Sequence, residues 1–104
     1  MNVLVVAPHP DDETLGCGGT LFRHKAEGDK IYWVIFTKIS VDTGWSEAAV
    51  KKRDAEIEAT AKKYGFTDVF NFRLPTIKLD TLPLSDLIEK ITDVYRKVEP
   101  EIIY

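Results

Sequence analysis

Short apolar runs alternate with helix-length segments along this chain, and this alternation limits the folds that it can adopt. A strand is predicted at residues 2–7, of which residues 3–7 form a continuous apolar run, typical of a strand buried on both faces of a parallel sheet. Further strands are predicted at residues 31–36, 69–72 and 102–104, and helices at residues 14–27, 46–64 and 84–98. Strand–helix–strand units connect parallel strands, so the sequence predicts an α/β fold with helices covering a parallel sheet.

The last two predicted helices carry recognisable signals. Ser46 is suited to cap the amino end of the second helix, because its hydroxyl can accept a backbone N–H of the first turn. Lys62 and Lys63 occupy the last turn of that helix and Gly65 follows it, as expected at a carboxyl end. Across residues 84–98, apolar side chains recur with a period of about 3.6, which predicts an amphipathic helix.

The predicted topology is a Rossmann-like three-layer sandwich with the strand order 3-2-1-4, expected to be incomplete at its C-terminus. Open α/β sheets bind ligands at the carboxyl ends of their strands, where the strand order reverses. In this order, the reversal lies between the first strand and the fourth. Residues 9–13 directly follow the first strand, so we expect them at the ligand-binding edge of the sheet.

Composition narrows the classes of function. A length of 104 residues fits a single domain. The 14 basic and 17 acidic residues are interspersed and give a net charge of −3, which argues against a nucleic-acid partner because phosphate binding needs a concentrated basic surface. No apolar run approaches the ~20 residues that span a bilayer. Cys17 is the single cysteine and has no partner within the chain, so a reducing, cytoplasmic compartment is expected.

The segment Pro8-His9-Pro10-Asp11-Asp12-Glu13 places an imidazole and three carboxylates close together. Such carboxylates repel one another unless a cation lies among them, and imidazole nitrogen and carboxylate oxygen suit a divalent metal such as zinc. His9 and Asp12 are three residues apart on a turn that enters a helix, so both can point to one ion. Asp11 lies between them and is suited to act as general base. The alternative is structural: the carboxylates favour the helix start, and His9 is a satisfied strand-end histidine.

This segment, followed by Leu15-Gly16-Cys17-Gly18-Gly19-Thr20, resembles the PIG-L/LmbE-like zinc-dependent N-deacetylases. The resemblance continues through Thr37, Arg53-x-x-Glu56 and Pro100-Glu101-Ile102-Ile103, and so spans nearly the whole chain. It implies a hydrolase that removes acetyl from an N-acetylglucosamine-type amino sugar or conjugate. By this resemblance His9 and Asp12 would bind Zn²⁺, or another divalent metal such as Fe²⁺. Asp11 would be the catalytic general base, and Arg53 would bind the substrate.

The family takes its third zinc ligand, a histidine, from a segment after the fourth strand, and this sequence stops before such a segment. The other histidine, His24, lies ten residues beyond Thr14, or ~15 Å along a helix, and is expected to face solvent. Residues 1–104 are therefore interpreted as the N-terminal part of a single deacetylase domain, inactive as an isolated piece. The oligomeric state, a homo-oligomer included, stays open.

Several rival interpretations remain at the level of sequence. Arg53 is equally an exposed helix arginine paired with Glu56 or Glu47. Trp45, in the loop before the second helix, either stacks on a sugar ring or packs against the helix start, whereas Trp33 belongs to a buried strand. The chain as a whole is alternatively a non-catalytic α/β fragment, or a module for sugar binding, metal binding or assembly. A nucleotide-binding domain is disfavoured, because the glycine-rich segment lacks the third glycine of the dinucleotide fingerprint.

Overall fold

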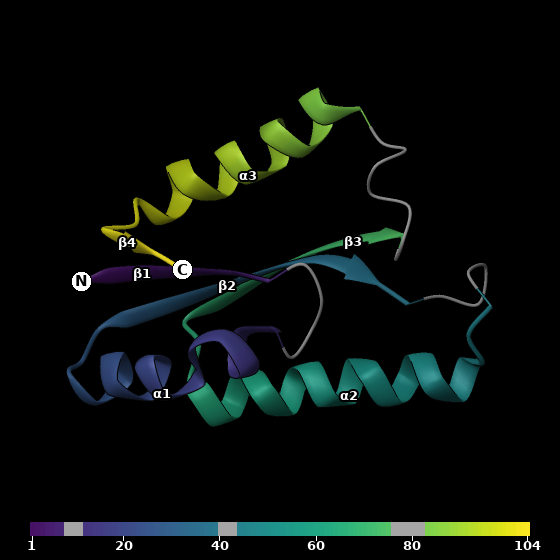
Figure 1. Ribbon diagram of the computed structural model, residues 1–104, viewed down its shortest axis with the longest axis horizontal. Helices are drawn as coiled ribbons and strands as arrows, with labels where there is room; N and C mark the ends of the chain where they lie inside the picture. The colour runs from purple at the N-terminus through teal and green to yellow at the C-terminus, as the bar shows by residue number, and fades with distance from the viewer. Residues whose placement is uncertain (8–11, 40–43, 76–82) are drawn as a thin grey trace.

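The computed structural model describes residues 1–7, 12–39, 44–75 and 83–104, and of residues 12–17 and Pro75 it describes the backbone alone. Within these residues, strands and helices alternate along the chain (Figure 1). The elements are β1 (Asn2–Ala7), α1 (Asp12–Ala26), β2 (Lys30–Lys38), α2 (Glu47–Tyr64), β3 (Asp68–Pro75), α3 (Leu84–Val98) and β4 (Ile102–Ile103). None of the described helices has the length and apolar character needed to cross a membrane.

The strands form one parallel sheet with the order β3-β2-β1-β4, as the sequence predicted. β1 pairs with β2 along its whole length, from Asn2 opposite Lys30 to Ala7 opposite Ile35. Helices α1 and α2 lie on one face of the sheet and α3 lies on the other (Figure 1). The predicted three-layer α/β sandwich is therefore confirmed.

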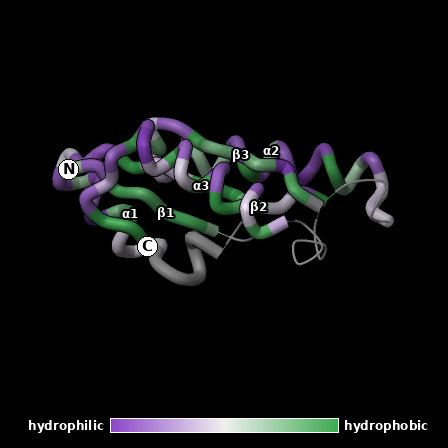
Figure 2. Tube along the Cα trace, turned by 90° about the horizontal axis from the view of Figure 1, so that it is seen from above, coloured by the Kyte–Doolittle hydropathy of each residue, from purple (hydrophilic) through white to green (hydrophobic). Residues whose placement is uncertain are grey.

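The core is divided by the sheet into two clusters of buried side chains. The cluster on the side of α1 and α2 contains Val5, Ala7, Leu21, Ile31, Trp33, Ile35 and Tyr64. The cluster on the side of α3 contains Leu4, Val34, Val94 and Val98. Successive side chains of a strand point to opposite faces, so β1 and β2 supply both clusters, and hydrophobic residues run along both strands in Figure 2. This explains why residues 3–7 form a continuous apolar run.

Both predicted caps of α2 are present. The Ser46 hydroxyl oxygen accepts a hydrogen bond from the Ala49 amide at 3.1 Å. Gly65 adopts the left-handed conformation with φ of 69°, and its N–H donates to the Ala61 carbonyl at 2.9 Å. These caps fix the two ends of the long helix that crosses the sheet beneath β2 and β3 (Figure 1).

β3 is longer than the predicted strand, because a bulge lets it continue past Arg73. Ile35 pairs with Asn71 but Thr37 pairs with Leu74, so β3 carries one extra residue in this stretch. Arg73 accommodates the extra residue by adopting a left-handed conformation with a φ of 57°. Its amide donates a hydrogen bond to the Asn71 side-chain oxygen at 3.2 Å. A bulge breaks the alternation of side chains between the two faces of the sheet. A prediction based on that alternation therefore ends the strand too early.

Candidate functional site

In the sequence, the acidic segment directly follows the carboxyl end of β1. β1 ends at Ala7 and α1 begins at Asp12, so residues 8–11 connect the carboxyl end of β1 to the helix. β1 pairs with β2 on one side and with β4 on the other, so the strand order reverses around β1. The carboxyl end of β1 is therefore the switch point at which open α/β sheets bind their ligands.

Two of the three predicted metal and catalytic residues belong to this connection, and the third, Asp12, is the first residue of α1. His9 and Asp11 lie outside the described residues, and of Asp12 the structure describes the backbone alone, at the first position of α1. The convergence of the three side chains on one ion therefore stays a prediction. The backbone position of Asp12 agrees with the expected turn into a helix.

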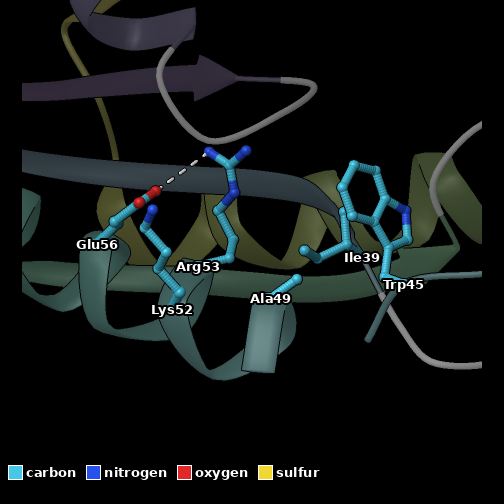
Figure 3. A pocket seen from close by; sticks show the side chains of 6 residues that line it. All are labelled: Ile39, Trp45, Ala49, Lys52, Arg53 and Glu56. Atoms are coloured by element: carbon cyan, nitrogen blue, oxygen red, sulfur yellow. Dashed lines mark ion pairs between the residues drawn. The ribbon is translucent and has the colours of Figure 1, made fainter. Parts of the chain in front are cut away.

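Arg53 lines a pocket of about 180 Å³ beside α2 (Figure 3). The pocket residues are Ile39, Trp45, Ala49, Lys52, Arg53 and Glu56. The Arg53 side chain is 31% exposed, and its Nη1 lies 3.6 Å from Glu56 Oε2. The predicted ion pair with Glu56 is thus present, and the same guanidinium group borders a pocket. Substrate binding by Arg53 stays a prediction.

Trp45 forms the apolar end of this pocket together with Ile39 (Figure 3). It is 44% exposed, so packing against the helix start leaves much of the indole open to a ligand. Trp33, by contrast, has no exposed surface, as the sequence predicted. Sequence reasoning missed Ile39, Ala49 and Lys52, because this wall depends on how α2 crosses the end of β2.

The expectation that His24 faces solvent is wrong. Its residue exposure is 9%, because the last turn of α1 packs over the amino ends of the strands. His24 Nδ1 lies 2.8 Å from Asp29 Oδ2, and Nε2 lies 2.8 Å from the Tyr104 hydroxyl. A carboxylate only accepts hydrogen bonds, so Nδ1–H donates to Asp29. His24 and Asp12 stand at opposite ends of α1, which agrees with its exclusion from the predicted metal site.

His24, Glu27 and Asp29 together form a group that could hold a metal ion, since each can place one ligand atom within 4.8 Å of the others. Every member of the group already has a partner. The Met1 ammonium lies 3.3 Å from Asp29 Oδ1, and Arg23 lies 3.3 Å from Glu27. An ion would have to displace these cations and the His24–Asp29 hydrogen bond. We therefore interpret the group as a satisfied polar network at the amino edge of the sheet.

This network predicts an acid-sensitive contribution to stability. The hydrogen bond from His24 lowers the pKa of Asp29 from its ordinary 3.8, against the opposing effect of burial, and the Met1 ammonium lowers it further. A carboxylate with a depressed pKa stabilises the folded state above its unfolded pKa, and this stabilisation is lost as the pH falls below it. We expect Asp29→Asn to be less stable than the wild type at about pH 7, with a smaller difference at about pH 2.5.

Urea unfolding at several pH values measures this effect. Asp93→Asn is the matched control, because Asp93 is exposed on α3 and should change stability little at any pH. A stability difference for Asp29→Asn that stays constant from neutral to acid pH would contradict the assignment.

The strand order and the helices on both faces of the sheet define a Rossmann-like α/β domain. The family model of the GlcNAc-PI de-N-acetylases, PIG-L, matches residues 4–104. The chain therefore belongs to the PIG-L family. No curated protein matches the chain.

The solved structures that match this chain include three that are similar to it over nearly its whole length. The conserved protein TT1542 of Thermus thermophilus is 33% identical with a TM-score of 0.78, and the match covers 99% of this chain and 44% of that one. The N,N'-diacetylchitobiose deacetylase of Pyrococcus horikoshii is 26% identical with a TM-score of 0.81, covering 97% and 39%. GalB, a 4-carboxy-2-hydroxymuconate hydratase from Pseudomonas putida, is 27% identical with a TM-score of 0.78, covering 99% and 46%. This chain spans less than half the length of each of these structures.

Proposed function

We propose that this chain forms the N-terminal part of a metal-dependent hydrolase that removes acetyl from an N-acetylglucosamine-type amino sugar or conjugate. The observation that carries the proposal is the family match over residues 4–104, which includes the acidic segment from the end of β1 to the start of α1. That segment follows the switch-point strand, where the chemistry of an open α/β sheet is expected. The cytoplasm is the proposed compartment, because the single cysteine suits reducing conditions.

His9 and Asp12 would hold the metal ion, with zinc proposed and Fe²⁺ as the alternative. The donor set fits such an ion, because imidazole nitrogen and carboxylate oxygen are ordinary zinc ligands. The ion would supply Lewis-acid activation of water. Catalytic zinc sites use three protein ligands, so two residues are not enough, and His24 is already engaged at the other end of α1. We expect the 104-residue chain alone to bind zinc weakly and to lack turnover.

Asp11 would act as the general base. It would take a proton from the attacking water and return a proton to the nitrogen of the leaving amine, so one carboxylate serves both halves of the hydrolysis. Arg53 would bind substrate hydroxyls from the side of α2. Its position at a pocket below the carboxyl ends of the strands supports this role (Figure 3).

Metal removal tests the proposed function directly. We expect the longest natural form that contains this chain to release acetate from an N-acetylglucosamine conjugate. Acetate release should stop after chelation of the metal and recover when zinc is restored. Acetate release that persists after complete chelation would contradict a metal-dependent mechanism. A metal-loaded protein without turnover would favour the alternative of a non-catalytic binding or assembly module.

A second candidate function is hydration of a carbon–carbon double bond. The likeness to the hydratase GalB favours this candidate. The chain is 27% identical to GalB and 26% identical to the deacetylase, so sequence identity does not separate the two. The two reactions have different products: a deacetylase releases acetate and a free amine, whereas a hydratase adds water to an unsaturated acid without releasing a fragment. The family match favours deacetylation, and an assay for both products separates the two.

A further inference from the structure

The pocket beside α2 has an apolar end and a charged end (Figure 3). Trp45, Ile39 and Ala49 provide apolar surface, and the indole is 44% exposed. Ala49 and the charged residues of the wall lie on one face of α2, since positions 52 and 53 are each three or four residues from both 49 and 56. An exposed indole next to charged side chains suits a ligand that has both a ring and a polar group.

Among the described lining residues, the charged end of this pocket has two cations and one carboxylate. Glu56 is paired with Arg53 at 3.6 Å, and the Lys52 ammonium adds a second positive charge. The nearby carboxylate of Asp54 is paired elsewhere, with Lys38 at 3.4 Å. The described residues that line the pocket therefore carry one net positive charge, on a chain whose overall charge is −3. A local charge opposite to that of the whole protein favours an anionic ligand group.

We propose that this pocket is a subsite for the part of the substrate attached to the amino sugar, and that it selects an aglycone with a ring and an acidic group. Trp45 would pack against the ring, and Lys52 would attract the acid alongside the Arg53–Glu56 pair. This inference rests on the proposed function for the identity of the sugar. Its test measures binding, so a chain without turnover still answers it.

The test uses two matched probes, the 4-carboxyphenyl and the 4-carbamoylphenyl glycosides of N-acetylglucosamine, which differ in charge and hardly in shape. Two-dimensional NMR follows the two indole N–H signals of the chain during titration. We expect the Trp45 signal to shift and the buried Trp33 signal to stay. The carboxylate probe should bind about three- to tenfold more tightly than its amide, as one partly exposed charge-assisted contact allows.

Variants separate the two ends of the pocket. Lys52→Gln should abolish the preference for the carboxylate probe, whereas Lys51→Gln should keep it, because Lys51 is exposed and does not line the pocket. Trp45→Leu should weaken the binding of both probes to a similar extent and leave the ratio of their affinities unchanged. Ligand-observed NMR measures binding for this variant, which lacks the indole signal.

Three results would overturn the inference: equal affinity for the two probes, an unchanged preference in Lys52→Gln, or a Trp45 signal that does not respond up to millimolar probe. The proposed function has a separate readout in acetate release by the longest natural form. Acetate release without a charge preference would remove the acidic subsite and keep the deacetylase. A charge preference without acetate release would keep the acidic subsite and remove the deacetylase.

Discussion

Replacing Asp11 by alanine should lower acetate release by about 10²- to 10⁴-fold, the usual contribution of a positioned general base. The loss should appear in kcat, because Asp11 acts on the proton of the attacking water. Its side chain is not an assigned metal ligand, so metal content should stay at the wild-type level. Steady-state kinetics and metal analysis of the longest natural form measure both quantities.

The neighbouring residues provide the controls for this prediction. His9→Ala and Asp12→Ala should lose bound metal together with activity, which distinguishes ligands from the base. Glu13→Gln should keep most of the activity, because Glu13 has no proposed part in metal binding or catalysis and lies in the first turn of α1. Preserved acetate release in Asp11→Ala would remove the base assignment and leave the metal ligands to be tested by themselves.

Replacing Trp33 by alanine should destabilise the fold by about 3–5 kcal/mol, the range for truncation of a large aromatic side chain in a core. Trp33 has no exposed surface, and its ring stacks on Phe66 with 5.1 Å between centroids. A small domain is stable by only about 5–15 kcal/mol, so the variant approaches the limit of folding. Urea or thermal unfolding followed by circular dichroism measures the loss.

Trp33→Phe should cost far less than Trp33→Ala. The indole N–H of Trp33 is buried and has no hydrogen-bond partner within the described part of the chain. Removing an unsatisfied buried donor relieves a penalty of about 1–3 kcal/mol, which offsets part of the lost packing. Trp45→Phe is the surface control and should change stability by less than about 0.5 kcal/mol. Equal losses for both Trp33 variants would show that the orphaned N–H has no energetic weight.

The sheet was predictable because its central strands are buried on both faces. The apolar run of β1 and the alternation with helices specify a parallel sheet, and connection rules leave few strand orders. The bulge in β3 was not predictable, because Arg73 in a left-handed conformation interrupts the alternation on which strand prediction depends. Local patterns therefore predicted the order of the strands better than the length of β3.

Long-range contacts explain what the sequence could not predict about His24. Its two ring partners are Asp29, across the turn after α1, and Tyr104, which is 80 positions away. The position of His24 in its helix suggested a solvent-facing side chain. That position gives no information on β4, which brings Tyr104 to the imidazole ring. Burial of a polar residue depends on such partners, and single-sequence patterns do not supply them.

The two parts of the candidate site differ in the same way. The acidic segment after β1 is contiguous, so its chemistry could be inferred from residue types and order. The pocket is assembled from the end of β2, the residues before α2 and one face of that helix. Positions 49, 52, 53 and 56 do follow the helical period, which is a signal that could have linked them. Trp45 lies directly before the N-cap Ser46, whereas Ile39 joins the pocket only because α2 crosses the end of β2.

The contact between Met1 and Asp29 makes the covalent state of the first residue a determinant of stability. The ammonium lies 3.3 Å from the carboxylate, and it exists only while the α-amino group is free. A retained formyl group, acetylation or an affinity tag placed before Met1 would replace this cation with an amide. Differently processed or tagged preparations of the same sequence would then differ in acid stability although their predicted catalytic residues are identical.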